Sequence, residues 1–254
     1  MWKNDILQVE IALQGGFDPN IIFSSVGFTP LQFAVGKPIG IMQMLLDHGA
    51  DVSTRDAMGC TALHYAAKRG YVDHLRLLLT YKADPNVCDG EGNTPLHTAA
   101  AYGHSNCVRA LLGGAEETLT DPNIRDVKGN TPLHIAATYG HNNCVSALFD
   151  KGADETLWNH GGWRPLMCAW KARFSGTAYL IIEETEMKEH KRLFEKNISE
   201  CELAVKMTTH HRLGTKMYLQ HLDIEVIDLI RKEYITKRRA EFIDSHDFHR
   251  DTLE

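Results

Sequence analysis

A four-residue phrase recurs along roughly the first two-thirds of this chain. It reads TPLQ at 29–32, TALH at 61–64, TPLH at 94–97 and 131–134, and changes to RPLM at 164–167. The intervals between its occurrences are 32, 33, 37 and 33 residues. Periods of this length are typical of small units that bury their apolar faces only by stacking on one another. The sequence therefore predicts an array of about five units rather than a single globular core.

Each unit has the residue pattern of two short helices. The phrase opens with Thr, a good helix N-cap, followed in most units by Pro, which suits the first helical turn. In the second unit Leu63, Ala66 and Ala67 then form a narrow stripe of apolar side chains, and Gly70 ends the helix. A second apolar stripe covers residues 72–79. We expect helix, turn, helix and a loop rich in Gly, Asp and Asn.

Longer phrases keep the same register and carry a family resemblance. They are TALHYAAKRGY, TPLHTAAAYGH and TPLHIAATYGH, with HGAD and KGAD upstream of later units. These phrases resemble the ankyrin repeat over residues 4–175 or so. The resemblance implies an all-α solenoid of helix-turn-helix-hairpin units. We expect an ankyrin-repeat domain over residues 1–175, in which residues 4–20 form a partial first repeat and the fifth full unit is degenerate.

Three departures from the pattern are informative. Pro38 replaces the usual turn of the first full unit, which predicts a reshaped loop between its helices. The segment LGGAEETLTDPN adds four residues between the third and fourth full units, as a surface loop tolerates. Trp170 stands where earlier units have Ala67, Ala100 and Ala137, so an ordinary sixth repeat cannot stack there unaltered.

Residues 176–254 match no family that we recognise. The chain has no proline after Pro165 and only Gly176 and Gly214 among its later glycines, which favours helix. Ile224, Ile227, Ile230 and Tyr234 form one apolar stripe within 224–243. We expect a helical segment that either caps the array or contacts a second protein.

Composition and motifs argue against several classes of function. The formal charge of −6 and the pI of about 6.1 speak against a nucleic-acid-coating protein, and no apolar run is long enough for a membrane span. The six cysteines contain no CxxC pair, and the tail cysteine and histidines lack the spacing of a zinc finger. Fingerprints of hydrolases and nucleotide-binding enzymes are absent. We expect no catalysis, no cofactor and no metal site, and a location in the cytoplasm or nucleus.

The remaining candidate for function is a surface. In a stacked array, the hairpin tips and the exposed positions of the first helices line up along one concave side. Tyrosine, tryptophan and arginine dominate binding hot spots, and they recur at equivalent positions on this side. The predicted partner-binding residues are Arg55, Tyr65, Arg69, Tyr102, Arg125, Tyr139, Trp158 and Trp163.

Two interpretations of this surface stay open. The first is a protein-protein interaction module, serving as scaffold, adaptor or inhibitor, with a protein partner on the concave side. The alternative is a modifying enzyme or effector whose array selects the substrate and whose C-terminal segment carries the activity. A bland possibility is that Tyr102 and Tyr139 only cover the neighbouring helix.

Overall fold

The described part of the chain is built from helices, turns and loops, without a strand. The structure is a computed structural model that describes residues 2–23, 25–113, 120–186 and 188. Its helices are α1 (Trp2–Gln14), α2 (Pro30–Ala34), α3 (Ile39–Asp47), α4 (Ala62–Arg69), α5 (Val72–Thr80), α6 (Pro95–Ala101), α7 (Ser105–Leu112), α8 (Pro132–Tyr139), α9 (Asn142–Phe149) and α10 (Pro165–Lys171), followed by a further helix at 175–186. The predicted all-α class is confirmed.

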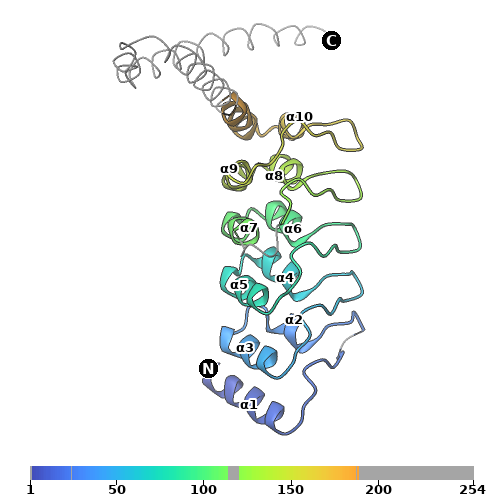
Figure 1. The fold of residues 1–254 in the computed structure, drawn as a ribbon, viewed down its shortest axis with the longest axis vertical. Helices are drawn as coiled ribbons and strands as arrows, with labels where there is room; N and C mark the ends of the chain where they lie inside the picture. Colours follow the sequence, from blue (N-terminus) through green and yellow to red (C-terminus); the bar gives the residue numbers. More distant parts are fainter. Residues whose placement is uncertain (1, 24, 114–119, 187, 189–254) are drawn as a thin grey trace, which may run out of the picture. The chain divides into compact units, whose positions relative to one another are not determined.

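The helices stack in two rows. Helices α2, α4, α6, α8 and α10 form an inner row beside the hairpins, and α1, α3, α5, α7 and α9 form an outer row. The long loops that precede the inner helices all extend to the same side of the stack (Figure 1). Equivalent residues of successive units therefore become neighbours, as the period predicts.

Local chemistry fixes where most inner helices begin. At α6 the hydroxyl oxygen of Thr94 accepts a hydrogen bond from the His97 N–H at 3.5 Å, and His97 Nδ1 accepts one from the Thr94 N–H at 3.2 Å. The same reciprocal capping box starts α2, α4 and α8. Arg164 caps α10 without a side-chain hydrogen bond, consistent with the decay of the phrase to RPLM.

Glycine occupies the turn between the two helices in the second, third and fourth full units. Gly70, Gly103 and Gly140 have φ values of 73°, 75° and 73°, in the left-handed region that glycine adopts readily. A Cβ at Gly70 would also lie 2.6 Å from the ring of His104 in the next unit, and one at Gly140 would lie 2.5 Å from the ring of Phe174. These glycines therefore serve unit stacking as well as chain reversal.

A continuous core runs between the two rows. The predicted stripe of α4, Leu63, Ala66 and Ala67, is fully buried. In the stripe over residues 72–79, Leu75 and Leu78 are buried and Val72 and Leu79 are partly buried. Buried apolar residues extend from Leu13 to Ile181. Trp170 is 39% exposed at the position where α8 has the buried Ala137, and its ring lies 6.0 Å from that of Tyr179. At α10 a partly exposed tryptophan thus replaces the buried alanine of α4, α6 and α8.

The first units follow the expected pattern. Helix α1 packs on α3 as an outer helix, so the N-terminal segment is the second half of a repeat. Pro38 is the N-cap of α3. At this position the helix needs no hydrogen bond from a backbone N–H, so the lack of one in proline has no cost. Residues 114–119, within the segment LGGAEETLTDPN that is four residues longer than in other units, lie outside the described residues.

The helix at 175–186 takes the place of the outer helix of the fifth full unit. Its side chains Ala178 and Ile181 are buried in the core, and the Thr177 hydroxyl donates a hydrogen bond of 2.6 Å to the Asn142 side chain of α9. The domain boundary that the sequence predicts after residue 175 lies at the beginning of this helix, so the helix belongs to the expected C-terminal segment. The predicted stripe from Ile224 to Tyr234 lies outside the described residues, so its role stays a prediction.

Candidate partner-binding groove

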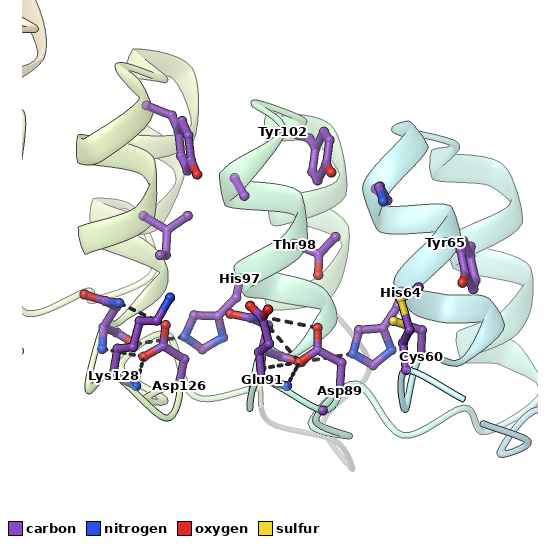
Figure 2. A pocket seen from close by; sticks show the side chains of 18 residues that line it. Cys60, His64, Tyr65, Asp89, Glu91, His97, Thr98, Tyr102, Asp126 and Lys128 are labelled. Atoms are coloured by element: carbon purple, nitrogen blue, oxygen red, sulfur yellow. Dashed lines mark hydrogen bonds between the residues drawn. The ribbon is translucent and has the colours of Figure 1, made fainter. Parts of the chain in front are cut away.

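A groove lies on the inner row between α4, α6 and α8 and the hairpins that precede them. Its volume is about 610 Å³. Figure 2 shows Tyr65, Thr98 and Tyr102 on neighbouring helices above a floor formed by hairpin residues. We call this the concave groove, and its lining residues are Met58, Cys60, His64, Tyr65, Lys68, Asp89, Gly90, Glu91, Asn93, His97, Thr98, Ala101, Tyr102, Asp126, Lys128, Asn130, Ile135 and Tyr139.

Buried or half-buried carboxylates hold the hairpins in shape. Asp126 Oδ1 accepts hydrogen bonds of 2.8 Å from the backbone N–H groups of Lys128 and Asn130. Asp89 makes the equivalent pair in the preceding hairpin, and Asp56 in the one before it. Because each carboxylate satisfies two backbone donors, the floor of the concave groove is a set of closed loops of fixed shape.

Histidines link each unit to the next. His64 Nε2 lies 3.0 Å from the carbonyl oxygen of Asn93, and His97 and His134 make the same contact to Asn130 and Trp163. Burial lowers the pKa of all three imidazoles below the usual value for histidine. The neutral ring therefore accepts from the capping threonine at Nδ1 and donates at Nε2 to the neighbouring hairpin.

The predicted tyrosines are brought together. Tyr65, Tyr102 and Tyr139 all line the concave groove. The Tyr65 hydroxyl donates to the Asp56 carboxylate, and burial together with this bond raises the Tyr65 pKa. Tyr102 and Tyr139 are 51% and 54% exposed, and Lys68 Nζ lies 5.4 Å from the centre of the Tyr102 ring. These two rings are therefore available to a ligand, whereas Tyr65 is held by the scaffold.

Most of the array matches models of known protein families. A family described as ankyrin repeats (three copies) matches residues 54–121 and 115–191, and the ankyrin repeat matches residues 26–57. The chain belongs to the ankyrin-repeat family. A search of curated proteins found no match to this chain. The match continues beyond residue 175, where the resemblance found in the sequence ends, and residues after 191 have no family match.

The predicted arginines fasten one ankyrin hairpin to the next. Arg125 Nη1 donates a hydrogen bond of 2.8 Å to the carbonyl oxygen of Trp158. Arg55 donates to the carbonyl oxygens of Gly59, at 3.1 Å, and of Cys88 in the following hairpin. Neither arginine lines the concave groove. Both guanidinium groups are thus committed to backbone contacts within the array.

The other predicted residues flank the concave groove without lining it. Arg69 is exposed at the end of α4. In the last hairpin, Arg164 lies 4.5 Å from the centre of the Trp158 ring, and Lys171 Nζ lies 4.6 Å from that of Trp163. The two tryptophans form an exposed aromatic-cationic cluster beyond the third hairpin that frames the groove.

Sequence reasoning missed the carboxylates that frame the hairpins. Asp56, Asp89 and Asp126 stand five positions before the phrase in three successive units, and Asn159 occupies this position in the fifth. Alignment of the units in register was sufficient to find them. Two charged residues of the concave groove, Glu91 and Lys128, stand at the same position of their units, three residues before the phrase. Their side chains carry opposite charges.

The concave groove is chemically suited to binding. Its cysteine, Cys60, is a poor nucleophile, because burial raises the pKa of the thiol to about 11. Within the described ranges, no group of three or more His, Cys, Asp and Glu side chains is arranged to hold a metal ion. The described helices also include none that is long and apolar enough to cross a bilayer. The lining combines exposed rings, backbone edges and charges of both signs.

Proposed function

We propose that this protein binds a protein partner in the concave groove and acts as a non-catalytic scaffold, adaptor or inhibitor in the cytoplasm or nucleus. Ankyrin repeats are in general protein-protein interaction modules. The observation that carries the proposal for this chain is the pair of half-exposed rings, Tyr102 and Tyr139, set at equivalent positions above hairpins of fixed shape. Rings on a preorganised surface lose little entropy on binding.

The form of the concave groove indicates what it accommodates. It spans three units and contains Lys68 and Lys128 as well as Glu91. The charge is mixed, so the groove provides no uniformly positive track of the kind that phosphate backbones require. A protein segment with apolar and polar side chains in alternation fits this lining better than a nucleic acid does.

The test uses matched baits. The full chain and its Tyr102→Ala/Tyr139→Ala variant are immobilised and exposed to extract from the native cell, together with an Asp73→Ala control. Asp73 is exposed on α5, in the outer row. A partner is retained by the unchanged chain and by Asp73→Ala and is lost from the tyrosine variant.

Calorimetric titration with that partner then gives the contribution of each ring. Tyr102→Ala and Tyr139→Ala should each weaken binding by about 1 to 3 kcal/mol if they are hot spots. Trp163→Ala reports whether the interface extends to the last hairpin. Equal losses from the outer-row variant, or no loss from the tyrosine variants, would remove the assignment to the concave groove.

A further inference from the structure

A second groove, at the N-terminal edge of the array, is almost entirely apolar. It has a volume of about 510 Å³ and is walled by Val9 and Ala12 of α1, Phe17 and Phe23 of the following loop, and Phe33 of α2. Phe33 is 60% exposed, and Phe23 packs edge-on against it at 5.9 Å. We call this the N-terminal groove. A concave apolar surface that is lined by exposed aromatic rings is a candidate binding site.

The repeat geometry tells what shape the N-terminal groove accepts. Each of α3, α5, α7 and α9 packs against the inner helix of its own unit. Helix α1 stands in the outer row, but residues 15–23 beside it form a loop, and no described inner helix precedes α2. The N-terminal groove lies between α1, α2 and this loop, with Ile41 and Leu45 of α3 also in its lining. It therefore coincides with the position that an inner helix of the first unit would occupy.

We propose that the N-terminal groove binds a short amphipathic helix of a partner protein, docked in the position of an inner helix. The buried stripe of such a helix carries small or aliphatic residues at i, i+3 and i+4, as the inner helices of this chain do. Lys37 is the one charged residue among those that line the groove. A helix with lysine or arginine on its buried stripe is therefore disfavoured, because burial would place like charges together.

Two residues of the N-terminal groove stand in the register of the concave side. Phe33 stands four positions after its phrase, the register of Tyr65, and Lys37 stands in the register of Arg69. One partner could therefore present a helix here and a further segment to the concave groove. The helix proposal does not depend on that second contact, since the residues of α1 are absent from the lining of the concave groove.

The experiment uses the chain's own inner-helix sequence as the probe. A fluorescein-labelled, hydrocarbon-stapled peptide of residues 131–141, TPLHIAATYGH, is titrated with the full chain and followed by fluorescence anisotropy. The staple is needed because a helix this short is marginal in water. We expect saturable binding. Absence of saturable binding to the full chain overturns the proposal.

Matched variants on α1 locate the probe. Ala12 is exposed and lines the N-terminal groove, whereas Ile11 is exposed next to it and does not. Ala12→Glu places a carboxylate in the apolar lining and should weaken binding about tenfold or more, while Ile11→Glu leaves it nearly unchanged. Glu is a good helix former, so both variants should keep α1, and circular dichroism verifies this. Equal effects of the two variants contradict the proposal.

Three further measurements separate the alternatives. If Tyr102→Ala/Tyr139→Ala abolishes probe binding, the peptide sits in the concave groove and the helix site is wrong; unchanged binding supports it, whatever the fate of the proposed function. Phe33→Ala should weaken the probe independently of α1. Sedimentation equilibrium tests a second copy as occupant. A dimer that Ala12→Glu dissociates and Ile11→Glu does not would assign the groove to self-association and overturn the partner-helix proposal.

Discussion

At the scale of single residues, Lys82 and Arg173 occupy positions where other units have glycine. Lys82 has φ of 64° at the end of α5, where Gly49 and Gly152 have 85° and 84° after α3 and α9. A Cβ at either glycine would meet nothing within 4 Å. Space therefore admits the lysine side chain, and the left-handed backbone alone is unfavourable, by about 1–2 kcal/mol for an L residue.

Lys82→Gly should stabilise the protein. Relief of the left-handed conformation outweighs the greater freedom of glycine in the unfolded chain, so the free energy of unfolding should rise by about 0.5–1 kcal/mol. Denaturant unfolding measures this. Lys151→Gly is the control, because Lys151 precedes Gly152 and does not have a positive φ. That variant should lower stability, and a similar loss from Lys82→Gly would show that Lys82 is not strained.

The buried histidines predict a pH dependence that the first unit lacks. Gln32 replaces histidine there, accepts from the Thr29 N–H at 2.9 Å and donates to the Cys60 carbonyl oxygen at 2.9 Å. A neutral amide thus makes both bonds of His64, His97 and His134. Protonation at Nδ1 removes the acceptor that the capping threonine needs in α4, α6 and α8.

The direction of the pH effect follows from the lowered histidine pKa values. The unfolded chain takes up protons below the ordinary histidine pKa of about 6.5, while the folded chain does not, so stability is full above that pH and is lost as pH falls. The denaturant midpoint should therefore drop between about pH 7.5 and pH 5.5. The variant His64→Gln/His97→Gln/His134→Gln should fold and show a flatter profile. An unchanged profile would assign the pH dependence to other groups.

At the scale of elements, these helices depend on their neighbours. Helix α2 has 5 residues and α6 has 7, too few to be stable in isolation. Capping boxes set where most inner helices start, and the buried stripes of alanine and leucine set how closely the rows approach. An element at the end of the array is therefore as important to stability as one in the middle, provided that it covers a stripe.

The helix at 175–186 should stabilise the array. Ile181→Ala removes a side chain that is fully buried in the core and should destabilise the protein by about 2–4 kcal/mol, whereas Ile182→Ala, at a partly exposed position, should have a smaller effect. A chain shortened after Arg173 should unfold at a lower denaturant concentration than the full chain. If both midpoints coincide, the helix does not cover the last core stripe.

At the scale of the whole molecule, the sequence predicted what is local or periodic. Thr94 and Pro95 determine the start of α6 by their own chemistry, and register alone placed Tyr102 and Tyr139 on the same face. The contact of Arg125 with the Trp158 carbonyl could not be predicted, because it depends on the backbone path of another hairpin. The N-terminal groove likewise depends on how α1, α2 and the loop at 15–23 pack against one another, a property of the assembled stack.

Arg173 bears on how such an array can change length. It stands where earlier units have Gly70, Gly103 and Gly140, and it has φ of 64°. In those units a ring from the following unit packs against the glycine, namely that of His104, His141 or Phe174. A Cβ at the glycine would clash with this ring. Tandem duplication of the third or fourth unit yields a copy that accepts a successor, whereas a duplicate of the fifth places Arg173 and Trp170 against an incoming neighbour. We therefore expect gain or loss of units to occur in the interior of the array, with the fifth unit kept as its end piece.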